Sequence, residues 1–102
     1  MSFDGTEGAQ ITLGDAGNLT KEYRDNNSGT KGAFIGSDEI NAILGQTGCK
    51  GIRVYFTQSS TGVKSIVMVG ADADENDLTD YVVGEAIKCP TCCGRSNKLN
   101  SD

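Results

Sequence analysis

The chain has 102 residues, with nine Lys and Arg against fourteen Asp and Glu, and it contains no histidine. The missing histidine excludes Ser-His-Asp and Cys-His catalytic mechanisms and removes the commonest zinc ligand. A net charge of −5 without any basic cluster disfavours nucleic acid and anionic membrane surfaces as partners. The length is enough for one domain with one modest core.

Residues 1–10 are predicted to form a flexible N-terminal arm ahead of a single domain over residues 11–102. The arm contains two glycines and two acids, with Phe3 as its one aromatic side chain. Such an arm either frays or packs Phe3 on a neighbouring subunit. It has neither the basic nor the apolar segment of a signal peptide, so a cytoplasmic location is expected, with signal-independent export as the alternative.

Two short helices are expected next. Thr12 and Asp15 have the spacing of a capping box, which predicts a helix over residues 13–25. A second helix is predicted with Ser37 as its N-cap and two acids in its first turn, and it is expected to stop at Gly45. Helices this short need tertiary packing, so both are expected to lie on a sheet.

The segment Gly48–Ala71 predicts one β-hairpin, around which the rest of the chain is expected to pack. Residues 52–57 alternate between apolar and polar, the period of a half-buried strand. Residues 59–62, Ser-Ser-Thr-Gly, supply the turn. The return strand contains four consecutive apolar residues and is therefore expected to be covered on both faces. These four residues are Ile66, Val67, Met68 and Val69.

An acidic loop follows the hairpin. Asp72, Asp74 and Asn76 alternate as in the first half of an EF-hand calcium loop. The likeness ends there, because Asp77 stands where that loop needs glycine and Val83 where it needs a bidentate glutamate. A solvated acidic turn is therefore the favoured interpretation.

A third strand over residues 78–87, interrupted at Gly84, and a cysteine-bearing tail complete the chain. Cys89 and Cys92 have the CxxC spacing that is typical of metal knuckles and redox motifs. A thioredoxin-like site is disfavoured, because no helix is predicted after the motif and the remaining chain is too short for such a sheet.

Cys49, Cys89 and Cys92 are the candidate ligands of a structural zinc site. They supply three thiolates, which leaves the fourth position to Cys93 or to a carboxylate. A disulfide that joins Cys49 to the tail is an equal alternative, and buried or idle thiols are favoured over both. In a reducing compartment, thiols or metal ligands are expected before disulfides.

Several short motifs together resemble a family of small uncharacterised bacterial proteins. The resemblance spans residues 11–101 and implies a domain that is complete at this length. It implies no activity, ligand or catalytic residue. The motifs are Gly48-Cys49-Lys50-Gly51-Ile52-Arg53-Val54-Tyr55, the upstream Tyr23-Arg24 and Asn27, Val67-Met68-Val69-Gly70 with Asp72, and Cys89-Pro90 with Cys92-Cys93-Gly94.

The sequence as a whole predicts an α+β fold, in which two N-terminal helices pack on a small, mainly antiparallel sheet built around the hairpin. The favoured function is a non-catalytic structural subunit that assembles with itself through Phe3 and residues 66–69, as a homo-oligomer or a filament. A small thiol or metal module in the CxxC tail is the alternative. An enzyme that uses Asp72, Asp74 or Asp77 is disfavoured, because the sequence shows no partner set for a catalytic pocket.

Overall fold

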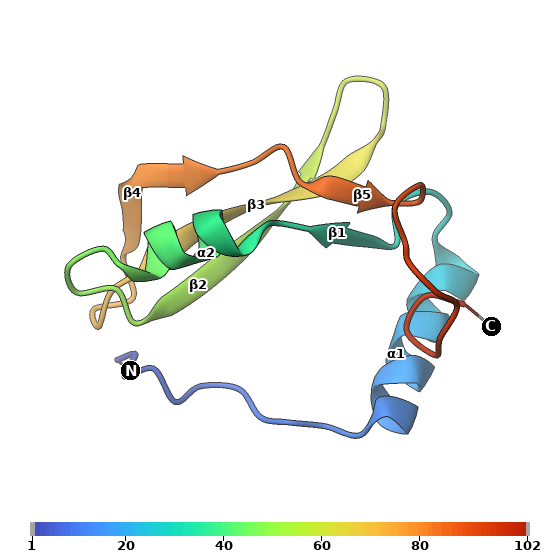
Figure 1. The fold of residues 1–102 in the computed structure, drawn as a ribbon, viewed down its shortest axis with the longest axis horizontal. Helices are drawn as coiled ribbons and strands as arrows, with labels where there is room; N and C mark the ends of the chain where they lie inside the picture. The colour runs from blue at the N-terminus through green and yellow to red at the C-terminus, as the bar shows by residue number, and fades with distance from the viewer. Residues whose placement is uncertain (1, 102) are drawn as a thin grey trace.

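The computed structural model describes residues 2–101 and has an α+β architecture, as the sequence predicted. Met1, the first residue of the predicted arm, and Asp102, the last residue of the predicted domain, lie outside the described residues. The strands form two antiparallel sheets, β2-β3-β4 and β1-β5 (Figure 1). The elements in chain order are α1 (Leu13–Asn26), β1 (Gly32–Phe34), α2 (Ser37–Leu44), β2 (Gly51–Gln58), β3 (Lys64–Ala71), β4 (Asp77–Val83) and β5 (Ile87–Cys89).

The predicted hairpin forms the centre of the larger sheet. β2 and β3 pair antiparallel over their whole length, from Gly51 opposite Ala71 to Gln58 opposite Lys64. The turn between them includes Gly62 at a φ of +87°, in the left-handed region that glycine adopts without strain. The alternating pattern of β2 and the turn chemistry therefore identified this hairpin correctly.

β4 pairs with the other side of β3, which makes β3 the central strand. The pairing is interrupted, because Gly70 lies opposite Leu78 whereas Val69 lies opposite Val82. Residues 79–81 therefore bulge out of the ladder. Within this bulge, the Tyr81 hydroxyl donates a hydrogen bond of 2.8 Å to the Glu39 carboxylate of α2.

The second sheet is a two-stranded ribbon that the sequence did not predict. The expected interruption at Gly84 is present, since β4 ends before it and β5 begins after it. β5 then pairs with β1, with Gly32 opposite Cys89 and Phe34 opposite Ile87. This pairing places the start of the C-terminal tail beside the connection between the two helices.

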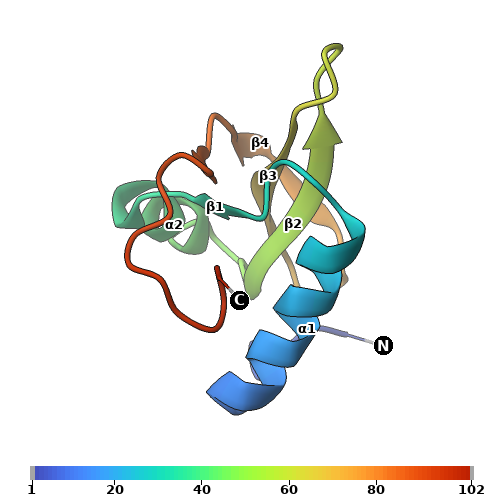
Figure 2. The ribbon, with the colours of Figure 1, turned by 90° about the vertical axis from the view of Figure 1, so that its right-hand side faces the viewer.

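The two helices pack differently, so the expectation that both lie on the sheet needs correction. α2 contacts β2, β3 and β4, and its Ile43 is fully buried. A Cβ at Gly70 would lie 3.3 Å from Ile43 Cγ2, so this glycine lets the helix approach the sheet closely. α1 has no comparable contact with either sheet among the described residues, and it lies at one end of the molecule (Figures 1 and 2).

The N-terminus of α1 nevertheless forms as its sequence predicted. Thr12 caps the helix, and its Oγ1 accepts a hydrogen bond of 3.0 Å from the Asp15 amide. The side of α1 that is covered holds Gly17, a buried residue, and the C-terminal tail occupies this position. The tail therefore takes the place on α1 that the sheet was expected to fill.

The hydrophobic core is small for a chain of this length. Its accessible surface is 7238 Å², whereas a folded monomer of 10.7 kDa is expected to expose about 5,500 Å². The radius of gyration is 15.1 Å, against about 13 Å for a compact domain of this length. The buried apolar residues are Ile43, Val69, Ala71, Val83, Ala86 and Cys89.

Candidate functional site

The structure does not bring the three predicted zinc ligands together. Cys89 is bonded to Cys93 in a disulfide, so it supplies no thiolate. Cys92 is an exposed free thiol, and the half-buried thiol of Cys49 donates to the Gly51 carbonyl at 3.2 Å. Within residues 2–101, no three His, Cys, Asp or Glu side chains form a group that could hold a metal ion.

The predicted link between Cys49 and the tail is also not formed. Cys49 lies in the connection between α2 and β2, and its sulfur is the atom nearest to a Cβ built at Gly70, at 2.9 Å. The β1–β5 ribbon leads the tail toward the opposite end of the molecule (Figure 1). The tail is instead fixed by the local Cys89–Cys93 disulfide and by hydrogen bonds to other elements.

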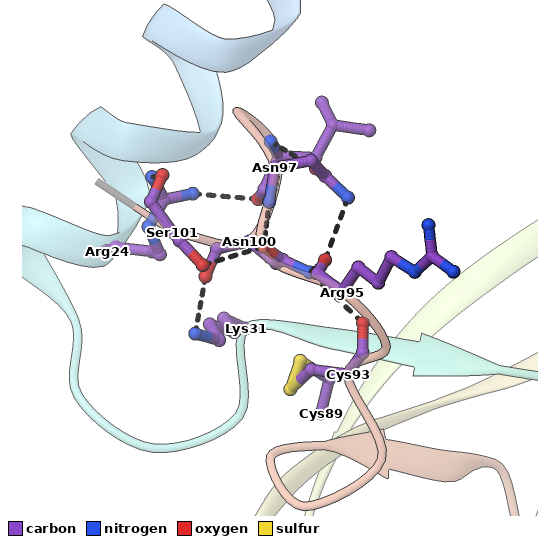
Figure 3. The surroundings of a disulfide bond; sticks show 9 residues. Arg24, Lys31, Cys89, Cys93, Arg95, Asn97, Asn100 and Ser101 are labelled. Carbon is purple, nitrogen blue, oxygen red and sulfur yellow. Dashed lines mark hydrogen bonds between the residues drawn. A yellow bond between two sulfur atoms is a disulfide. The ribbon is translucent and has the colours of Figure 1, made fainter.

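Asn100 connects the end of the tail to the disulfide (Figure 3). Its side-chain amide donates to the carbonyl oxygens of Cys93, at 3.1 Å, and Arg95, at 2.8 Å. The backbone carbonyl of Asn100 accepts a hydrogen bond from the ammonium group of Lys31, which precedes β1. The tail thus closes into a loop whose base is the disulfide.

This loop in turn positions α1. The Arg24 guanidinium donates to the carbonyl oxygens of Leu99, at 2.7 Å, and Ser101, at 3.0 Å. About two turns earlier in the helix, a Cβ at Gly17 would come within 2.9 Å of Lys98 Cβ, so only glycine leaves room for the tail there. The location of α1 therefore depends on a tail that is itself held by the disulfide.

The acidic loop after β3 is a turn that is stabilised by its own side chain. One oxygen of the Asp72 carboxylate accepts the amides of Asp74 and Asn76, each at 3.0 Å. The Asp72 amide donates to the Asn76 carbonyl at 3.0 Å and closes the turn. The alternating positions of Asp72, Asp74 and Asn76, which resembled a calcium loop, therefore belong to a turn that the Asp72 carboxylate stabilises.

A polar cluster spans the face of the three-stranded sheet that is opposite α2. Asp77 accepts hydrogen bonds of 2.6 Å from both Tyr55 and Arg53. The Tyr55 hydroxyl, followed by the Arg53 guanidinium, lowers the pKa of Asp77, and the same bond raises the pKa of Tyr55. The cluster joins the start of β4 to β2.

Phe3 packs on this same cluster and therefore on its own chain. Its ring centroid lies 5.4 Å from Arg53 Cζ, a cation–π distance. Its amide donates to the Ala73 carbonyl at 3.0 Å. The residue that was expected to anchor the arm on a neighbouring subunit thus has an intramolecular position in this structure.

The outer edge of β2 is a candidate surface for association. β3 pairs with β2 over its whole length and with β4 from Met68 to Ala71, and Val69 is only 3% exposed. β2 pairs with β3 alone, and no backbone hydrogen bond joins its outer edge to another described residue. The strand has no proline and no bulge, and its one charged side chain, Arg53, is bound to Asp77.

Natural edge strands are usually protected by such features, because unpaired backbone groups attract other strands. β4, the opposite edge of this sheet, is protected by its bulge at residues 79–81. On β2, Val54, Tyr55 and Phe56 are 43%, 45% and 89% exposed. The β2 edge is therefore both unpaired and apolar.

An apolar groove of about 680 Å³ lies between α1 and the turn end of the hairpin. This volume is within the usual range of small-molecule sites. Its polar lining includes Lys31 and Lys64, and no acidic residue among residues 2–101 takes part in it. Its apolar wall is formed by Leu19, Tyr23, Ala33, Phe56 and Ile66.

The sequence did not reveal this groove, although it held part of the signal. Leu19 and Tyr23 lie four residues apart in the helix that the capping box predicted, and so on one face of it, and Phe56 belongs to the alternation that predicted β2. Periodicity identifies the apolar face of an element but not what covers it. Because the tail rather than the sheet packs on α1, these faces border an open groove.

Comparisons with protein-family models, with curated proteins and with solved structures found no match for this chain. None of the helices in residues 2–101 has the length and apolar character that crossing a membrane requires.

Proposed function

We propose that this chain is a non-catalytic subunit that associates with itself, and that two copies join along the free edges of their β2 strands. The observation that supports this most directly is the surplus of exposed surface. In the described part of the chain, fourteen large apolar or aromatic side chains are exposed, whereas Ile43 alone among the large side chains is fully buried. Exposed apolar surface on this scale is typical of interaction sites.

The size of the surplus agrees with association. The accessible surface exceeds the value for a compact monomer of this mass by about 1,700 Å². A stable protein interface buries about 800 Å² on each partner. The surplus is therefore equivalent to about two such contacts, although the extended arm and tail account for part of it.

A second copy of the chain fits the β2 edge by geometry and charge. Two β2 strands that pair antiparallel across a twofold axis would join the two sheets into one of six strands. If Val54 of each copy lies opposite Tyr55 of the other, Arg53 faces Phe56 and like charges do not meet. β2 contains no acidic residue, so the net charge of −5 is located elsewhere on each subunit.

This arrangement closes on itself and gives a dimer. A filament would need a second contact of the head-to-tail type. Because each subunit has a net charge of −5, added salt should strengthen the association by screening the repulsion between copies.

Charge placed on the β2 edge tests the proposal. Val54→Lys should shift the protein from dimer to monomer in sedimentation velocity, because a lysine at the centre of the pairing would be desolvated without a partner. Val63→Lys is the matched control, since Val63 has similar exposure, 46% against 43%, but lies in the hairpin turn. A full-length protein that remains monomeric at high concentration contradicts the proposal, as does equal loss of dimer in both variants.

A thiol-exchange module is the second candidate, because the exposed thiol of Cys92 is adjacent to a cysteine of the disulfide. The Cys92 thiolate would attack Cys89 Sγ, form the Cys89–Cys92 bond and release Cys93 as a thiolate that takes up a proton. This exchange needs no external oxidant. Peptide mapping after alkylation would support the module if it finds both pairings, and would contradict it if Cys93 alone is bonded to Cys89.

A further inference from the structure

The groove between α1 and the hairpin has a local charge opposite to that of the whole protein. The chain contains fourteen acidic side chains, and none of those within residues 2–101 lines the groove, whereas two of the nine basic ones do. These two, Lys31 and Lys64, accompany an apolar wall that includes the aromatic rings of Tyr23 and Phe56. A groove with this lining is complementary to a molecule with an apolar body and an anionic end.

The two lysines are available to bind an anion. Lys64 lies at the start of β3 and is exposed, and its ammonium group has no hydrogen-bond or ion-pair partner among the described residues. Lys31 donates to the backbone carbonyl of Asn100, and within residues 2–101 no carboxylate pairs with its ammonium group. Both ammonium groups can therefore donate charge-assisted hydrogen bonds to a ligand.

The apolar wall of the groove is also accessible to a ligand. Phe56 is 89% exposed and Leu19 is 67% exposed, although both line the groove. A flexible alkyl chain can cover such side chains without a pocket preshaped to one rigid ligand. Burial of each methylene group on the ligand would increase affinity by up to about fourfold.

We infer that this groove binds a free long-chain carboxylate, whose alkyl chain lies against Leu19, Phe56 and Ile66 and whose carboxylate faces Lys31 and Lys64. This inference does not rest on the proposed self-association, because the groove is formed within one chain; Phe56, Thr57 and Gln58 of β2 belong to its lining, whereas Val54 does not. The tail contributes indirectly, since it holds α1 in place as one wall of the groove.

Dodecanoate below its micelle concentration is a suitable probe, with dodecylammonium as a control of equal chain length and opposite charge. Isothermal titration calorimetry should show dodecanoate binding to one site per chain, and weaker binding of dodecylammonium. The net charge of −5 favours the cation everywhere else on the protein, so preference for the anion would identify the lysines of the groove. Equal or tighter binding of dodecylammonium overturns the inference, as does the absence of dodecanoate binding.

Substitutions locate the site. Lys64→Gln should weaken dodecanoate binding about tenfold, the effect of losing one charge-assisted hydrogen bond of roughly 1.4 kcal/mol. Lys50→Gln is the matched control, because Lys50 is also exposed and lies outside the groove lining, and it should leave the affinity unchanged. Equal losses in the two variants would contradict this location of the carboxylate.

Two further measurements separate the inference from its alternatives. The Val54→Lys variant should retain dodecanoate binding even as a monomer, so failure of self-association and failure of ligand binding can be distinguished. Sedimentation with phosphatidylglycerol vesicles should show no binding of the protein. Binding to vesicles without binding of monomeric dodecanoate would indicate a membrane surface as the ligand and overturn the inference.

Discussion

Ile43→Ala should destabilise the protein more than any other truncation of a single apolar side chain, because Ile43 is 0% exposed and lies between α2 and the sheet. The substitution removes three carbon atoms, which corresponds to about 2.4 kcal/mol of lost transfer free energy. The cavity left behind raises the total to about 3–4 kcal/mol. A domain of this size has about 5–15 kcal/mol of stability, so the melting temperature should fall by more than 10 °C.

The neighbouring residue provides the control for this prediction. Leu44→Ala removes a similar volume from the same helix, but Leu44 is 47% exposed, so about half of the transfer term, roughly 1.2 kcal/mol, is expected. Urea unfolding followed by circular dichroism at one fixed protein concentration measures both, because association would make stability concentration-dependent. Equal losses in the two variants would refute the location of the core beneath α2.

Three other predictions follow from the contacts of the tail and of β4. Gly17→Ala should displace Lys98 and accelerate tryptic cleavage of the tail, whereas Gly14→Ala, whose Cβ meets nothing closer than 3.9 Å, should not. Cys93→Ser should have the same effect as Gly17→Ala, because it removes the disulfide at the base of the tail. The folded-state pKa of Asp77 lies below its ordinary value of 3.8, so its stabilising contribution is present above that value and is lost as the pH falls through the folded pKa. Acid titration followed by circular dichroism should therefore show a smaller loss of stability below about pH 4 in Asp77→Asn than in the unmodified protein, and equal losses would contradict this role.

Local sequence signals predicted the regular elements well. The cap at Thr12, the alternation over residues 52–57 and the turn at residues 59–62 each depend on interactions within a few positions. These signals identified α1, α2 and the hairpin, and all three are present. The break at Gly84 was also visible, because glycine interrupts strands.

Long-range pairing was not visible in the sequence. β1 and β5 are three residues each, and their pairing joins positions more than fifty residues apart, for which no periodic pattern exists. That pairing decides where the tail begins, and so it also decides that Cys89 bonds to Cys93 and does not approach Cys49. The spacing of the cysteines allowed several pairings, and the topology of the ribbon selects among them.

The sequence indicated residues 66–69 of β3 as the association surface, whereas the contact proposed from the structure lies on β2. The apolar run at residues 66–69 indicated a strand covered on both faces; β3 is the central strand of its sheet, and of these residues Val69 is buried whereas the other three are half-buried. The unpaired edge belongs to β2, whose sequence alternation is equally compatible with an interior position. Which of two paired strands forms an edge depends on where the third strand adds, and the interrupted β4 segment did not reveal it.

Hydrogen–deuterium exchange as a function of protein concentration tests the proposed β2 contact most directly. Pairing of two β2 edges should slow exchange of the outward-facing amides of residues 51–58 as the concentration rises through the dimerisation range. Exchange in β4, the edge with the bulge, should not change. Slower exchange confined to β2 is the predicted result, and concentration-independent exchange along β2 in a protein that nevertheless dimerises would contradict this contact.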